Sequence, residues 1–220
     1  NGCPMNLDIF SDVICPWCFI GKRRIARAIT TESDVAVRVR WRAFMLNPDM
    51  PAEGMDRQSY LALKFGGPAQ ARRVYENVLR AAASEGLELA LDRIPRTPST
   101  VAAHRVIRWA ETQGDADPVV EGLFRAYFQE GRDIGNPAEL AEIAGECGFD
   151  AADVRTMLAA PDGAAEVVAE DRAARRIGIN GVPCFIFDGQ YAVSGAQEPE
   201  VFAPIFAAAR SGALASSAAQ

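Results

Sequence analysis

Two cysteines separated by two residues, Cys15-Pro16-Trp17-Cys18, constrain the fold of this chain more than any other feature. The motif follows an apolar run at residues 7–10 that is typical of a buried strand. After the motif, residues 19–29 alternate basic and apolar side chains as an amphipathic helix does. We therefore expect the cysteines at the point where a strand ends and a helix begins.

The two cysteines are predicted to have different environments. Unpaired N–H groups and the positive end of the helix dipole favour a thiolate at a helix N-terminus, so we expect Cys15 to be an exposed nucleophile near neutral pH. Cys18 shares a helix face with Gly21 and Ile25, and we expect that face to pack on the sheet and bury Cys18. An exposed attacking thiol with a buried resolving thiol suits thiol–disulfide exchange.

The same motif has two structural interpretations. Half of a zinc site would need two more ligands, but the chain has one histidine, and its three other cysteines are not paired at short spacing. A structural disulfide of such short span would add little stability. We therefore favour redox chemistry. Pro16 suits a first helical turn, and Trp17 either offers a docking surface beside the sulfur or covers the helix end.

Composition indicates a globular protein that binds neither nucleic acid nor membrane. The 220 residues are 49% hydrophobic and 24% charged, which suits one large domain or one domain with an insertion. A net charge of −6 leaves no basic excess for phosphates, and no apolar run approaches the length of a membrane span. Five cysteines with one evident pair, and an N-terminus without signal-peptide features, favour a cytoplasmic location.

Three zones follow one another along the chain. Residues 5–55 are predicted to form a strand, the helix after the motif and a second strand at residues 35–41. Residues 56–177 are predicted to be helical throughout, and residues 178–212 to return to strands. The predicted fold class is α/β, in which residues 5–55 and 178–212 form one discontinuous domain and residues 56–177 an all-helical insertion. The predicted helices are residues 57–65, 69–85, 99–112, 118–130, 137–147, 151–159, 163–176 and 199–210.

The third zone opens with Gly181-Val182-Pro183, directly before an apolar strand at residues 184–187. A hairpin turn signal, Asp188-Gly189-Gln190, connects that strand to the next. A proline is tolerated at the first residue of a strand. The sequence alone does not show whether the Val182–Pro183 peptide bond is cis.

Five segments contain the residues on which a resemblance to a known family rests: residues 11–21, 46–48, 103–105, 178–183 and 193–197. Together with the helical insertion, they resemble the DsbA-like branch of the thioredoxin superfamily, and more narrowly the FrnE-like oxidoreductases. The resemblance covers nearly the whole chain and implies a thioredoxin fold. It also implies that the Val182–Pro183 bond is cis and faces the Cys15 sulfur, and that the backbone at Val182 pairs with an extended substrate segment.

The resemblance also suggests a proton acceptor on the first strand. Relatives often have a buried acid there that takes the proton of the resolving cysteine, and Asp8 is the candidate in this chain. Asp8 stands one residue further upstream than the acid of DsbA, and the alternative interpretation is a polar residue on a partly exposed face. Asp12 is interpreted as a cap or a charge at the helix start.

The remaining reactive or charged residues have structural interpretations. Cys184 is placed to form a side disulfide with Cys15, although a small apolar residue in a buried strand is favoured. Cys147 is interpreted as core, and His104, the single histidine, as packing or capping. The basic cluster at residues 22–24 is interpreted as a solvated helix face.

Two other functions remain open. Kappa-class glutathione transferases and 2-hydroxychromene-2-carboxylate isomerases share this architecture, but they usually have Ser where Cys15 stands and lack the second cysteine. A non-catalytic chaperone or binding module would use the helical groove and need neither cysteine. The favoured function, a dithiol–disulfide oxidoreductase, needs no metal or organic cofactor, with glutathione as a candidate reductant. Its substrate would be a protein or small-molecule thiol or disulfide, and the pattern sets neither the direction of exchange nor the oligomeric state.

Overall fold

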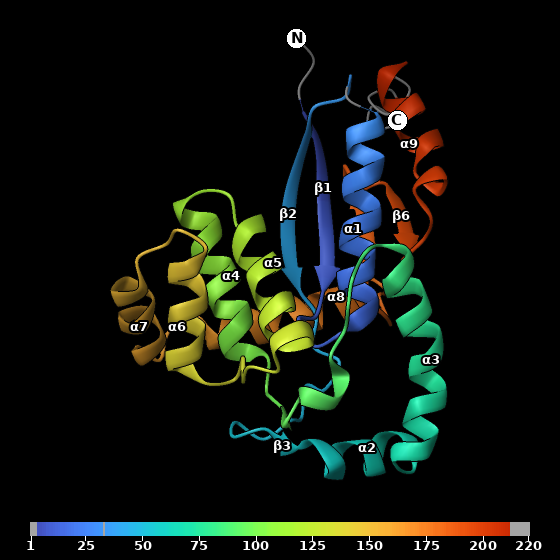
Figure 1. Cartoon of the computed structure of the whole chain (residues 1–220). Helices are drawn as coiled ribbons and strands as arrows, with labels where there is room; N and C mark the ends of the chain where they lie inside the picture. The colour runs from blue at the N-terminus through green and yellow to red at the C-terminus, as the bar shows by residue number, and fades with distance from the viewer. Residues whose placement is uncertain (1–3, 33, 212–220) are drawn as a thin grey trace.

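A computed structural model describes residues 4–32 and 34–211. Its centre is a mixed sheet of four strands in the order β2-β1-β5-β6. β1 (Met5–Ser11) pairs parallel to β2 (Val37–Ala43) and antiparallel to β5 (Cys184–Phe187), which forms a hairpin with β6 (Tyr191–Ser194). Segments from the two ends of the chain therefore lie side by side in one sheet (Figure 1).

The two faces of the sheet pack against different helices because side chains alternate along each strand. Leu7 and Ile9 of β1 belong to the main apolar cluster with α1 (Pro16–Thr31) and α9 (Ala203–Arg210). Phe10 belongs instead to a cluster with Cys184 and with Ala174 of α8 (Ala164–Arg176). The sheet is thus covered on both faces, as expected for an α/β fold.

The segment between β2 and β5 is predominantly helical, as predicted, and its boundaries follow local signals. Asp56, Asn136 and Asp150 accept backbone N–H bonds at the starts of three helices. Two short strands, β3 (Met55–Asp56) and β4 (Arg96–Thr97), form a small sheet that the sequence did not predict. The helices are α2 (Arg57–Phe65), α3 (Pro68–Ser84), α4 (Val101–Gln113), α5 (Asp117–Arg125), the π-helical turn η2 (Ala126–Glu130), α6 (Pro137–Glu146), α7 (Ala151–Ala159) and α8.

The helix α8 connects the two predicted domains. The sequence placed it in the insertion, within residues 56–177, but it lies behind the sheet in Figure 1 and packs against β2 as well as α4. The Glu170 carboxylate accepts the N–H of Ala43 at 2.8 Å, and the Asp171 carboxylate accepts that of Met45 at the same distance. The predicted second segment, residues 178–212, ends one residue beyond the described chain.

Helix α1 is tied to the insertion by aromatic and ionic contacts. The Phe19 ring stacks on Phe124 with a centroid distance of 5.0 Å. Lys22 pairs with Asp117 at 2.8 Å, although its side chain is only 8% exposed. Arg24 is buried and pairs with Glu85 at 2.9 Å. The prediction that residues 22–24 are a solvated face is therefore wrong for Lys22 and Arg24, since their partners come from helices far away in the sequence.

No helix in the described ranges combines the length and the apolar character needed to cross a membrane.

Candidate active site

Cys15 occupies the junction between β1 and α1 that the sequence predicted. It is the N-cap residue of α1, with extended backbone dihedrals, and Pro16 begins the helix. Its N–H donates to the Asp12 carbonyl at 2.9 Å, and its own carbonyl accepts the Cys18 N–H at 3.0 Å. Cys15 therefore stands at the N-terminal end of α1, although its side chain makes no capping hydrogen bond there.

Cys15 is buried rather than exposed. Only 4% of its surface is accessible, so the prediction of an exposed nucleophile is wrong for this structure. It belongs to the main apolar cluster, against which the half-buried Trp17 and Val182 pack. Because Val182 comes from the other end of the chain, no pattern around the motif could show this covering.

Cys18 is buried, as predicted, with 1% of its surface accessible. Burial raises the pKa of its thiol well above the usual value, and the hydrogen bond and charge of Cys15 raise it further. The nearby backbone of Asp12 and hydroxyl of Ser11 lower the pKa of this thiol, but by less than burial raises it. Cys18 is thus held as a neutral thiol behind Cys15.

The loop before β5 faces the Cys15 sulfur. The Cys15 thiol donates to the Val182 carbonyl at 3.6 Å, and the Val182–Pro183 peptide bond is cis. Pro183 rests against α1 at Gly21, where an added Cβ atom would lie 2.8 Å from the proline Cγ. The structure therefore brings together four residues singled out in the sequence: Cys15, Cys18, Val182 and Pro183.

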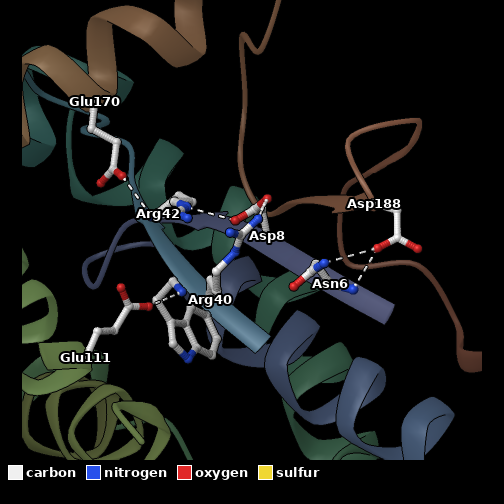
Figure 2. Close-up of polar contacts among 8 residues, drawn as sticks. Asn6, Asp8, Arg40, Arg42, Glu111, Glu170 and Asp188 are labelled. Carbon is white, nitrogen blue, oxygen red and sulfur yellow. Dashed lines mark hydrogen bonds and ion pairs between the residues drawn. The ribbon is translucent and has the colours of Figure 1, made fainter. Parts of the chain in front are cut away.

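Asp8 lies away from Cys18. Its carboxylate pairs with Arg40 at 2.7 Å and with Arg42 at 2.8 Å, and Arg42 also reaches Glu170 (Figure 2). The physical reason is the alternation of the strand: Leu7 and Ile9 face α1, so Asp8 between them faces the other way. The structure thus favours the alternative interpretation of Asp8, a polar residue that is paired at a partly exposed face.

Asp12 is a buried acid that the sequence interpretation missed. Its side chain is fully buried and makes no capping hydrogen bond at the start of α1. Its Oδ2 atom accepts a hydrogen bond from the Leu46 N–H at 2.7 Å. The other oxygen, Oδ1, lies 3.4 Å from Nε2 of His104, which is also buried. Neither of these two atoms has a partner with ordinary hydrogen-bond geometry among the described residues. The signal available in the sequence was the position of Asp12, three residues before Cys15.

Among the described residues, neither Cys184 nor Cys147 forms a disulfide with Cys15 or Cys18. Cys184 is 3% exposed and faces the α8 side of the sheet with Phe10, which supports its interpretation as a small apolar residue. The Cys147 thiol donates to the Pro118 carbonyl at 3.2 Å and is half-buried. Cys3 lies outside the described residues. Residues 4–32 and 34–211 contain no group of three or more His, Cys, Asp or Glu side chains suited to a metal ion.

Comparison with known proteins identifies the family and the fold of the chain. The model of the DSBA-like thioredoxin domain family matches residues 6–207. The chain belongs to the DSBA-like thioredoxin domain family. The predicted DsbA-like membership and thioredoxin fold with added helices are therefore confirmed, whereas the narrower FrnE-like assignment stays a prediction.

The similarity to known proteins extends over nearly the whole chain. A probable DsbA oxidoreductase from Streptomyces coelicolor is 35% identical, with a TM-score of 0.82, and the match covers 92% of this chain and 88% of that one. The protein YwbO of Bacillus subtilis is 26% identical over 199 residues, 90% of this chain and 94% of YwbO. A 2-hydroxychromene-2-carboxylate isomerase has a TM-score of 0.68 over 98% of this chain and all of its own, at 15% identity, so it shares the fold alone.

Proposed function

We propose that this protein is a thiol–disulfide oxidoreductase that exchanges disulfides through Cys15 and Cys18. One observation carries the proposal: two cysteines lie at the start of α1, one with its thiol on the carbonyl of Val182 and the other buried behind it. Membership of the DSBA-like family supports the same chemistry. The reaction is the transfer of two electrons and two protons between this dithiol and a substrate disulfide.

The exchange proceeds in two displacement steps. The Cys15 thiolate attacks one sulfur of the substrate disulfide; a mixed disulfide forms, and the first substrate thiolate leaves. Cys18 then loses its proton and attacks the Cys15 sulfur, which breaks the mixed disulfide and releases the second thiolate. The two substrate thiolates take up two protons, equal in number to those that Cys15 and Cys18 release. The protein ends as a disulfide and the substrate as two thiols, and the reverse sequence donates the disulfide.

The second step needs a base, because the pKa of the buried Cys18 thiol is raised. We propose Asp12 and His104 for that role in place of Asp8. The hydroxyl of Ser11 is close enough to Cys18 to lower the pKa of its thiol. A small, partly open cavity of about 10 Å³, about the size of one water molecule, is lined by both Ser11 and His104. The proton of Cys18 would pass by that route to His104, whose Nε2 atom lies 3.4 Å from the Asp12 carboxylate.

Pro16, Trp17, Val182 and Pro183 are proposed to border the substrate site. Pro16 and Trp17 are half-buried at the start of α1, and Val182 and Pro183 lie opposite the Cys15 sulfur. An extended substrate segment would add to the backbone at Val182 with little sequence preference. The proposed reaction requires no metal or organic cofactor, and the cysteine content favours a cytoplasmic, reducing location; both stay proposals.

The reduction potential of the Cys15–Cys18 pair is the decisive measurement. The protein is equilibrated against glutathione buffers, and the thiols are trapped and counted. A potential near about −120 mV would make it a disulfide donor, and one near about −270 mV a reductase or isomerase. If no disulfide forms between the two cysteines at any potential, or if Cys15→Ser leaves exchange intact, the proposal is wrong. The glutathione-linked isomerase would then become the first alternative.

A further inference from the structure

A buried arginine connects helix α1 to the turn after β6, residues 195–198. The chain after β6 lies beside α1 in Figure 1. Arg24 is 8% exposed, and its Nε atom donates to the carboxylate of Glu85, the C-cap residue of α3, at 2.9 Å. Its Nη1 atom donates to the backbone carbonyl of Ala196 at 2.6 Å, and its Nη2 atom lies 2.6 Å from the Glu198 carboxylate. Arg24 therefore binds the turn through its backbone as well as through a side chain.

The same turn is bonded to the loop that faces Cys15. The Gly195 N–H donates to the Pro183 carbonyl at 2.8 Å. Gly195 has a φ of +83°, a left-handed conformation that favours glycine. A methyl group on Gly21 would lie 3.5 Å from the Ala196 side chain, so the turn also lies against α1. The carbonyl that Arg24 binds and the N–H that binds Pro183 thus belong to adjacent residues.

The other side of the loop gives Val182 little support. Ile179 is buried, but Asn180 and Gly181, which lie between it and Val182, are exposed. A methyl group on Gly181 would meet no atom within 4 Å. The position of the Val182 backbone therefore depends mainly on Pro183 and on the turn that binds the Pro183 carbonyl.

A guanidinium is suited to fix such a turn. A hydrogen bond with a charged donor is shorter and stronger than one between neutral groups, and the planar fork of arginine holds several acceptors at fixed angles. The Glu85 carboxylate orients the Arg24 guanidinium from α3, and the guanidinium in turn orients the Ala196 carbonyl. A displacement of about 1 Å far from the reacting atoms can slow a reaction by as much as about 10²-fold.

We propose that Arg24 is a positioning residue for substrate recognition. Through the turn at residues 195–198, it sets the place of the Val182–Pro183 backbone to which an extended substrate segment adds. The inference rests on the proposed oxidoreductase function and adds a specificity determinant to it: the arrangement favours disulfides carried by polypeptide chains, whose backbone can pair with Val182. Arg24 takes no part in electron or proton transfer.

Two uncharged disulfides that differ in having a peptide backbone test the proposal. One is the disulfide-linked dimer of an extended, end-capped pentapeptide with a central cysteine, and the other is 2-hydroxyethyl disulfide. The reduced protein is mixed with each, and the second-order rate of Cys15–Cys18 oxidation is measured by thiol trapping. Taking the ratio of the peptide rate to the small-disulfide rate removes the difference in leaving-group basicity, which all variants share.

Arg24→Lys retains a positive charge beside Glu85 but has a single head group in place of the fork. It is expected to lower the ratio about tenfold, the usual effect of losing one or two backbone hydrogen bonds to the substrate. If this variant does not fold, Arg24→Met combined with Glu85→Leu replaces the buried pair by apolar side chains, which usually costs little stability, and it should lower the ratio as much.

Lys22→Met is the matched control. Lys22 is another buried cation of α1, but its carboxylate partners, Asp117 and Glu121, both lie on α5. The variant should leave the ratio unchanged even where it lowers the unfolding free energy, because a purely structural role affects both disulfides alike. An equal fall in Lys22→Met, or an unchanged ratio in the Arg24 variants, would overturn the inference.

The wild-type protein separates this inference from the function on which it rests. Oxidation of the protein by 2-hydroxyethyl disulfide but not by the peptide would overturn the positioning role and leave the oxidoreductase standing. Oxidation by neither disulfide would instead overturn the proposed function.

Discussion

Pro183 closes the space in front of Gly21: a methyl group on Gly21 would lie 2.8 Å from the proline Cγ atom and 3.3 Å from Cζ of Phe185. The absence of a side chain on α1 is therefore what lets the loop opposite Cys15 lie against the helix. Gly21→Ala is expected to lower the free energy of unfolding by about 1–3 kcal/mol, as overpacking does, and to slow exchange by displacing Pro183 from the Cys15 sulfur. Urea unfolding and a disulfide-exchange assay would measure the two effects.

Gly181 supplies the control for the stability part of this prediction. It lies in the same loop, but a methyl group there would meet no atom within 4 Å. Gly181→Ala is expected to change the unfolding free energy by less than about 0.5 kcal/mol, as surface substitutions usually do. Equal losses in the two variants would show that the contact between Gly21 and Pro183 is not the cause.

The raised pKa of Cys18 predicts how the stability of the reduced protein depends on pH. Below the unfolded-state pKa of a cysteine, about 8.5, the thiol is protonated in both states and stability does not change. As pH rises above that value, the unfolded chain loses the Cys18 proton while the folded protein retains it, so stability falls by up to about 1.4 kcal/mol per pH unit. Urea midpoints between pH 7 and 10 under reducing conditions would show the loss.

Cys18→Ala isolates this contribution, because burial also raises the pKa of Cys184 and Cys147. Above pH 8.5 the unfolding free energy of the variant should fall less steeply with pH than that of the wild type, by up to about 1.4 kcal/mol per pH unit. Identical slopes would mean that the Cys18 pKa is not raised in the folded protein.

The buried pair between Arg24 and Glu85 predicts a large stability effect far from the cysteines. Glu85 is 3% exposed at its side chain and pairs with both Arg24 and Arg27 at 2.9 Å. Glu85→Ala leaves the buried guanidinium of Arg24 with the Ala196 carbonyl and the exposed Glu198 carboxylate as partners, and is expected to cost about 3–5 kcal/mol. Glu142→Ala, at an exposed pair with Arg132, should cost less than about 1 kcal/mol. Similar losses in chemical denaturation would contradict the assigned difference in burial.

Local patterns predicted the secondary structure well because caps, prolines and alternation act over a few residues. The predicted helix at residues 57–65 matches α2, and the strand at 184–187 matches β5. The predicted helix at residues 118–130 divides into α5 and the π-helical turn η2, a change of hydrogen bonding that apolar spacing does not reveal. Strand β2 begins two residues later than predicted, since its register is set by pairing with β1.

The candidate site was predictable only where one segment determines it. The burial of Cys18 followed from its helix face, but the burial of Cys15 depends on covering by segments from elsewhere in the chain. Asp8 lies on β1 between Leu7 and Ile9, so its side chain faces away from α1, whereas Asp12 lies beyond the end of β1, where strand alternation no longer decides burial. The pairing of Asp12 with His104 joins residues 92 positions apart, which no spacing rule connects.

The Asp12–His104 pair predicts a specific kinetic defect. His104→Gln, which preserves polarity but cannot take a proton, is expected to slow resolution of the mixed disulfide by about 10²-fold at pH 7, the usual loss when a positioned acid–base group is removed. Attack by Cys15 on the substrate should change little, because that step does not use the Cys18 proton. Rapid mixing with acid quench, followed by mass measurement of the mixed disulfide, separates the two steps.

The pH profile distinguishes proton transfer from packing. If His104 and Asp12 accept the proton, the defect should shrink as pH rises, because hydroxide then deprotonates Cys18 directly. A purely structural role predicts a loss that is constant with pH and is accompanied by a lower unfolding free energy. Asp8→Asn is the matched control: its carboxylate is bound by Arg40 and Arg42, and the variant should resolve the mixed disulfide at the wild-type rate. A defect in Asp8→Asn with none in His104→Gln would return the acceptor role to Asp8.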